Sequence, residues 1–143
     1  MRQTLAFAEL PVDHADPERP LWPAVRHGLM CRCPNCGSGP LLRAYLKVRD
    51  ACPVCGEDYS HQRADDGPAY LTILIVGHLL APVIYFTFTT FRPAPMTMAL
   101  GFSGLTIALA LFLLPRLKGM LVAFQWAKRM HGFGPTPELP DHG

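Results

Sequence analysis

Two long apolar runs constrain this chain more than any other feature of its sequence. Residues 71–91 and 96–114 carry no formal charge, and Arg92, between them, is the only charged residue of that whole stretch. At about 1.5 Å per residue, either run as a helix is about as long as a bilayer's hydrocarbon core of roughly 30 Å. A chain of 143 residues has too little other protein to wrap both runs in a soluble core. The sequence therefore predicts two transmembrane helices joined by a tight turn over residues 92–95, whose prolines stop both helices.

The remaining composition fits a small polar module attached to that anchor. Charged residues make up 17% of the chain, against about 25% in a typical soluble domain, and most of them precede the first run. The net charge of +2 is too small to indicate nucleic acid as a partner by itself. No Walker loop, GxSxG, HExxH or dinucleotide-binding motif occurs, so no enzyme class is indicated and we expect a protein without enzymatic activity.

Basic residues beside the runs predict how the chain is oriented. Lys and Arg resist translocation, and they lie before the first run and after the second, with only Arg92 between the runs. The flanking basic residues are Arg43, Lys47, Arg49 and Arg63 on one side and Arg116, Lys118, Lys128 and Arg129 on the other. Both termini are therefore expected on the cytoplasmic side of the membrane.

The segment after the second run changes pattern at Pro115. Leu117, Leu121 and Phe124 follow the spacing of one helical face, which predicts an amphipathic juxtamembrane helix over residues 115–131 with Trp126 as a headgroup-level anchor. A continuation of the second membrane helix explains the same pattern. Proline-rich or glycine-rich composition predicts flexible segments over residues 1–25 and 132–143.

Four cysteines form the strongest chemical signal in the chain. Cys33 and Cys36, then Cys52 and Cys55, make the spacing C-x2-C-x15-C-x2-C, and each pair ends in Cys-Gly. Two-residue turns bring both sulfurs of a pair to one side, which is typical of a closed, structural four-thiolate zinc site. We therefore expect one structural zinc ion in a zinc ribbon over residues 26–63, with short β-strands between its two halves.

Other accounts of the cysteines remain open at this stage. Iron or an iron–sulfur cluster would accept the same ligands, and a disulfide framework would need an oxidising compartment. Thioredoxin-like dithiol chemistry would need a βαβ context that the short module cannot hold. Cys31 is interpreted as a spare thiol, although it could replace a neighbouring ligand, while His27 and His61 flank a set of ligands that is already complete.

His78 is the only histidine inside a predicted span and is a candidate functional residue. An ionisable side chain at that depth is expected to face protein or water and to mark a function. It could bind haem or a metal, or hydrogen-bond Thr106, Ser103 or a backbone carbonyl of the second span.

Two further patterns are interpreted as structural. In the junction over residues 64–70, Pro68 suits a first helical turn, and Asp65 and Asp66 favour the positive end of the helix dipole. Small residues in the second span permit close helix packing within the hairpin or with another membrane protein, and these are Ala99, Ser103, Gly104 and Ala108.

Taken together, the paired CPxCG module, the Asp-Asp-Gly-Pro-Ala junction, the Gly77-His78 pair and the two spans resemble a family of uncharacterised small bacterial inner-membrane proteins. The resemblance covers about residues 28–132. Members of that family are often encoded beside cytochrome oxidase and its assembly functions, so the resemblance implies an inner-membrane location, a periplasmic turn and a role near respiratory-chain assembly.

The expected fold class is a small α+β membrane protein with an N-terminal zinc ribbon, a two-helix transmembrane hairpin and a C-terminal amphipathic extension. The expected function is a non-enzymatic adaptor, whose ribbon docks a partner and whose hairpin packs on a larger membrane complex such as an oxidase or an assembly factor. The alternatives are metal or haem handling through His78 and nucleic-acid binding by the ribbon. The last is the weakest, because Arg43, Lys47 and Arg49 are opposed by nearby Asp50, Glu57 and Asp58.

Overall fold

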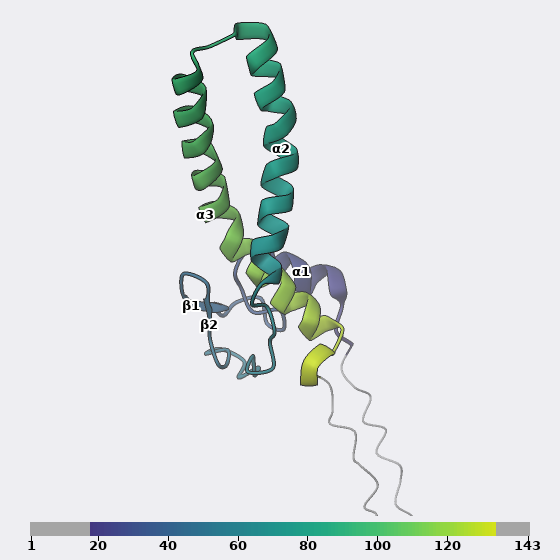
Figure 1. Cartoon of the computed structure of the whole chain (residues 1–143). Coiled ribbons are helices and arrows are strands. Elements are labelled where there is room, and N and C mark those ends of the chain that lie inside the picture. The colour runs from purple at the N-terminus through teal and green to yellow at the C-terminus, as the bar shows by residue number, and fades with distance from the viewer. Residues whose placement is uncertain (1–17, 134–143) are drawn as a thin grey trace, which may run out of the picture.

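The computed structural model describes residues 18–133, over which the chain forms three α-helices, one pair of short strands and a final 3-10 turn (Figure 1). The elements are α1 (Leu21–Leu29), β1 (Leu42–Ala44), β2 (Lys47–Val48), α2 (Gly67–Phe91), α3 (Pro95–Ala127) and the turn Met130–Gly132. The parts of the predicted flexible segments at residues 1–17 and 134–143 lie outside the described residues.

Helices α2 and α3 form the predicted antiparallel hairpin. By length and composition both can cross a membrane, with mean hydropathies of 2.0 and 2.1 in their most apolar windows. α2 starts four residues earlier than predicted because Gly67 and Pro68 occupy its first turn, where a proline N–H is not needed. Arg92 ends the helix in the left-handed conformation, with φ of 43°. The two helices lie close together near the start of α2 and spread apart toward the connecting turn (Figure 1).

α3 continues through Pro115 to Ala127, so the alternative of one continuous helix holds over a separate helix for residues 115–131. A proline inside a helix leaves the carbonyl four residues earlier without its N–H donor. Here that carbonyl belongs to Leu111, and the hydroxyl of Tyr45 donates to it at 2.7 Å. The β-hairpin thus supplies a hydrogen bond that Pro115 cannot supply, which lets the helix continue.

α1 lies within a segment that the sequence predicted to be flexible through residue 25, and that prediction was wrong for residues 21–25. Pro23 falls in the first turn of α1, where helical N–H groups have no partner in any case. The helix is held by packing on α3, where Gly28 meets Gly119 so closely that neither position has room for a Cβ atom. Glycine at both positions lets the two backbones touch.

The part of the molecule formed by α1, the strands and α3 after Pro115, which we call the base, has its own core. Cys33, Leu41, Cys52, Tyr59, Ala64 and Val122 form one buried cluster, so the ribbon and α3 share a core. Trp126 was predicted to lie at the membrane headgroups, but it is only 3% exposed. It packs on Ala24 and Phe133, and the Arg19 guanidinium lies 4.7 Å from its ring centre. Protein therefore covers the side of α3 that carries Trp126, while Phe124, on the predicted apolar face, is 38% exposed.

Candidate metal centre

Two matching backbone turns carry the four cysteines. In the first, the Gly37 N–H donates to the Cys33 carbonyl at 2.9 Å, and in the second the Gly56 N–H donates to the Cys52 carbonyl at 3.0 Å. Both glycines have positive φ, 69° and 76°, which residues with a Cβ atom rarely adopt. The Cys-Gly ending of each pair is therefore what closes each turn and points two sulfurs inward.

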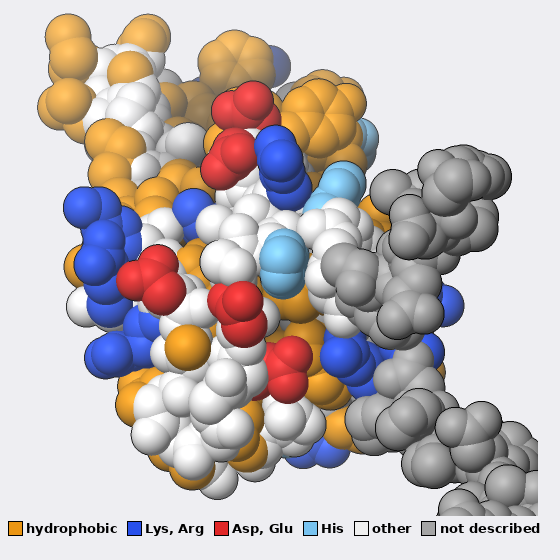
Figure 2. Space-filling model, turned by 90° about the horizontal axis from the view of Figure 1, so that it is seen from below, with side chains coloured by type: hydrophobic (Ala, Val, Ile, Leu, Met, Phe, Trp, Pro, Cys, Tyr) orange, Lys and Arg blue, Asp and Glu red, His pale blue; other side chains and the backbone are white. Residues whose placement is uncertain are grey.

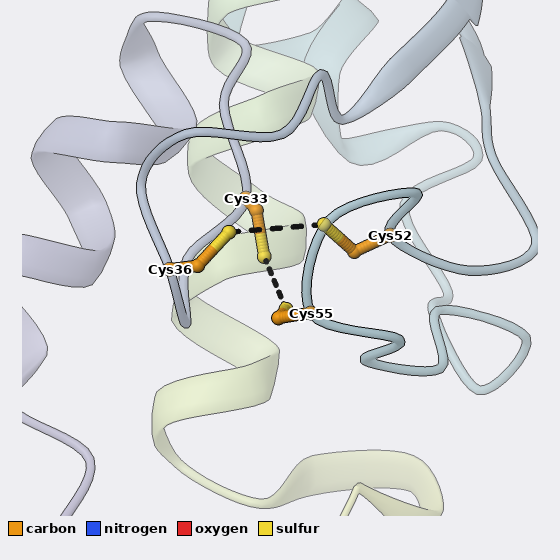
Figure 3. A group of neighbouring side chains, drawn as sticks. All are labelled: Cys33, Cys36, Cys52 and Cys55. Atoms are coloured by element: carbon orange, nitrogen blue, oxygen red, sulfur yellow. Dashed lines mark hydrogen bonds between the residues drawn. The ribbon is translucent and has the colours of Figure 1, made fainter.

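The short strands hold the two turns face to face. β1 and β2 pair antiparallel, with Leu42 opposite Val48, and single bridges join Arg32 to Pro40 and Ala51 to Asp58. As a result, the side chains from the two turns converge on one point (Figure 3). This is the arrangement that the sequence spacing predicts for a ribbon.

The sulfur positions fit a tetrahedral metal ion. The Cys33 and Cys55 sulfurs are 3.6 Å apart, the Cys36 and Cys52 sulfurs 3.8 Å, and all four ligand atoms lie within 4.8 Å of one another (Figure 3). A zinc–sulfur bond of about 2.3 Å gives tetrahedral sulfur–sulfur edges of about 3.8 Å. These separations are far longer than a disulfide bond of about 2.05 Å, and all five cysteines are free. The four thiols can therefore hold one metal ion, with no disulfide framework.

The protein environment treats the four thiols differently. Burial raises the pKa of Cys33 to about 12. Burial also opposes ionisation of Cys52, but the backbone N–H groups of Cys55 and Val54 outweigh it and lower the pKa of Cys52 to about 6. The backbone N–H of Gly39 likewise lowers the pKa of Cys36. Backbone N–H groups aimed at sulfur favour the thiolate form, which is the form that binds metal.

Tyr59 belongs to the surroundings of this centre, although no sequence motif marks it. Its side chain is completely buried, and its hydroxyl has no partner of good hydrogen-bond geometry among the described residues. Burial, followed by the nearby sulfurs of Cys33 and Cys52, raises the pKa of Tyr59. A neutral hydroxyl beside thiolates can donate to sulfur when a metal is bound. No spacing rule in the sequence points to a tyrosine at this position.

The centre is joined to α3 by more than apolar contact. The Gln125 side chain accepts from the Arg63 N–H at 2.8 Å and donates to the Arg63 carbonyl at 2.9 Å. This pair of bonds fixes the chain between the second cysteine turn and α2. The separate ribbon and juxtamembrane segments expected from the sequence are thus one packed unit.

His78 lies away from the metal centre, exposed on the outer side of α2. Its Nδ1 is 2.8 Å from the carbonyl of Leu74 in the same helix, whereas the sequence analysis considered partners in the second span. A carbonyl only accepts, so Nδ1 carries the hydrogen, and Nε2 of the neutral ring keeps its lone pair. Cys31 is half-buried, and its sulfur lies 3.6 Å from the Pro115 carbonyl, outside the four-cysteine group.

The other predicted residues are placed as follows. Asp66 is the N-cap residue of α2, but its side chain makes no capping hydrogen bond, so Asp65 and Asp66 can act only through their charge. Pro68 is buried in the first turn. Ala99 and Ser103 line an open groove between α2 and α3. Gly104 and Ala108 are exposed, and a Cβ atom at Gly104 would meet nothing within 4 Å, so the packing predicted for them does not occur within the hairpin.

The fold and site together define a class: a small protein in which a four-cysteine ribbon is packed on the end of a long apolar helix hairpin. The chain belongs to the family described as proteins of unknown function (DUF983), whose model matches residues 42–126. The match includes the second cysteine pair, α2 and nearly all of α3, and begins after Cys33 and Cys36. Searches of curated proteins and of solved structures found no significant match.

Proposed function

We propose that the protein is a non-enzymatic accessory subunit of a larger complex in the bacterial inner membrane. α2 and α3 cross the bilayer, both termini lie in the cytoplasm, and Arg92 lies at the periplasmic end. The four cysteines hold one zinc ion whose role is structural, because four thiolates leave no open coordination position for chemistry. Zinc binding makes the base rigid although the base contains few residues.

One observation carries this proposal: the hairpin leaves an unfilled groove between its two helices. The groove holds about 600 Å³, and its lining includes Ile84 from α2 and Ala99, Ser103 and Thr106 from α3. Small residues and hydroxyl groups let a neighbouring helix approach closely and form hydrogen bonds in the membrane. A helix of a partner membrane protein suits this groove by size and by chemistry. The family resemblance suggests a haem–copper oxidase or one of its assembly factors as that partner.

Purification from native membranes in a gentle detergent tests the proposal. At endogenous expression, we expect the native chain to co-purify with a defined membrane complex and to carry one zinc ion per chain by elemental analysis. Ser103→Leu should release the complex by filling the groove. Gly104→Leu is the matched control, because it adds the same side chain where the structure has open space. Recovery of the chain alone, or equal retention by both variants, would contradict the groove as the docking site.

A second function, metal or haem handling through His78, is favoured by one contact. The bond from Nδ1 to the Leu74 carbonyl turns the lone pair of Nε2 outward, and histidines that bind metals commonly donate their other ring nitrogen in this way. The test is an absorption spectrum and metal analysis of the same eluate. Loss of a visible band or of a second metal in His78→Ala, with ribbon zinc retained, would favour this function. The absence of both a cofactor band and a second metal from the native chain would reject it.

A further inference from the structure

α1 carries an exposed face, largely apolar with Arg26 between Trp22 and Met30, that the proposed function does not use. Ala24 and Gly28 are buried against α3, while Trp22 is 78% exposed and Met30, just after the helix, is 60% exposed. Beside Trp22, an apolar groove of about 380 Å³ is lined by Leu21, Trp22 and Val25 of α1 and by Met120, Leu121 and Phe124 of α3. A surface of this kind usually contacts another molecule.

Contacts with α3 fix the level of this face along the hairpin. The sulfur of Cys31, just after α1, lies 3.6 Å from the Pro115 carbonyl, and Gly28 touches Gly119. The apolar run of α3 ends at residue 114. α1 also lies near the start of α2, at the end of the helix hairpin opposite the connecting turn (Figure 1). The exposed face is therefore at the depth where two membrane-spanning helices would leave the hydrocarbon core.

Charges near this level suit the phosphate groups of lipids. Arg26 is exposed on α1, and Arg116 turns back over α3, with its guanidinium 3.7 Å from the ring centre of Phe112. On the other side of the base, the β-hairpin of β1 and β2 carries exposed Arg43 and Lys47 on either side of Tyr45. Viewed from below, Asp and Glu side chains are spread over the middle of the base, and a large group of Lys and Arg lies at the edge beside the strands (Figure 2).

We propose that α1 is an interfacial anchor, with Trp22 and Met30 inserted at the boundary between headgroups and acyl chains of the cytoplasmic leaflet. Amphipathic helices with an aromatic residue on their apolar face lie in this way, about 5–10 Å into the boundary. The spans already hold α1 next to the leaflet, so insertion needs no separate association step. This inference rests on the proposed membrane placement of α2 and α3.

Tryptophan fluorescence of the full zinc-loaded chain in lipid nanodiscs tests the proposal. The chain has two tryptophans, Trp22 and Trp126, and Trp126 is buried in protein. The difference between the native chain and Trp22→Phe therefore reports Trp22 without disturbing the core. With lipids brominated near the top of the acyl chains, we expect quenching of the native chain to exceed that of Trp22→Phe by about twofold. Iodide in the water should quench the two chains equally.

A third chain separates failure of the anchor from failure of membrane insertion. Leu79→Trp in the Trp22→Phe background places a reporter at an exposed position near the middle of α2. Lipids brominated deep in the acyl chains should quench it. If they do so while Trp22 is quenched by iodide and not by shallow bromines, α1 lies in water and the anchor is overturned. If the reporter is not quenched by deep bromines, the membrane placement itself is wrong and the anchor falls with it.

Discussion

Gly119→Ala is the substitution that most directly tests how the base is built. A Cβ atom at position 119 would overlap the backbone carbonyl of Gly28 and lie 3.4 Å from a methyl carbon of Leu41. The overlapped atom belongs to the backbone, so it cannot rotate aside and α1 as a whole must move. Overpacking costs about 1–3 kcal/mol, and we take the upper end because no side chain can relieve this overlap.

The helix propensity that alanine gains over glycine, about 1 kcal/mol, is the same with α1 attached or detached, because α3 is helical in both states. The cost to the packing of α1 therefore stays at about 3 kcal/mol. That cost corresponds to a roughly 140-fold shift toward a state with α1 detached from α3, at about 1.4 kcal/mol per factor of ten. Amide hydrogen exchange in nanodiscs measures this shift directly. Peptides covering α1 should exchange about 140-fold faster in Gly119→Ala, while the middle of α2 keeps its protection.

Gly104→Ala is the control for the same measurement. It makes the same chemical change in the same helix, at a position where a Cβ atom meets nothing within 4 Å, so exchange in α1 should not change. If the exchange rate of α1 is unchanged in Gly119→Ala, the close contact between the two glycines does not determine how α1 packs. Equal acceleration in both variants would lead to the same conclusion.

The remaining predictions concern the metal centre and its supports. Cys52→Ser should lose the metal and unfold the ribbon, because metal binding supplies roughly 10–16 kcal/mol in small zinc domains; elemental analysis should find zinc retained in Cys31→Ser. Zinc uptake at neutral pH should release the proton of Cys33, whose pKa burial raises to about 12, so zinc affinity measured by competition with a chelator should fall as pH is lowered. Gln125→Leu leaves two backbone groups without partners and should destabilise the base by roughly 2–4 kcal/mol in denaturant unfolding. Tyr45→Phe should cost about 1 kcal/mol in the same assay, and no change would mean that the freed α3 carbonyl needs no donor.

The features that the sequence predicted well depend on neighbours in the chain. Absence of charge over about 20 residues needs no tertiary contact to be recognised, and the spacing of the cysteine pairs brings their sulfurs together through two local turns closed by Gly37 and Gly56. The missed features depend on residues far apart in sequence. Whether the helix continues through Pro115 stayed open in the sequence because the compensating donor, Tyr45, lies 70 positions earlier, on the ribbon hairpin. α1 was missed because Gly28 and Gly119 hold it in place.

The two tryptophans show a further limit of a hydrophobic pattern. The pattern predicted an apolar face of α3 on Leu117, Leu121 and Phe124, but of these only Leu117 is buried and Phe124 is 38% exposed. The side of the helix that protein covers instead carries Gly119, Val122, Ala123 and Trp126. In the structure α1 and Phe133 cover Trp126, and Arg19 lies over its ring. Covering that face in turn leaves Trp22 on the outer side of α1, 78% exposed. We therefore propose Trp22 as the aromatic anchor that the sequence predicted at Trp126. Strong quenching of Trp126 by brominated lipids in the Trp22→Phe chain would reverse that assignment.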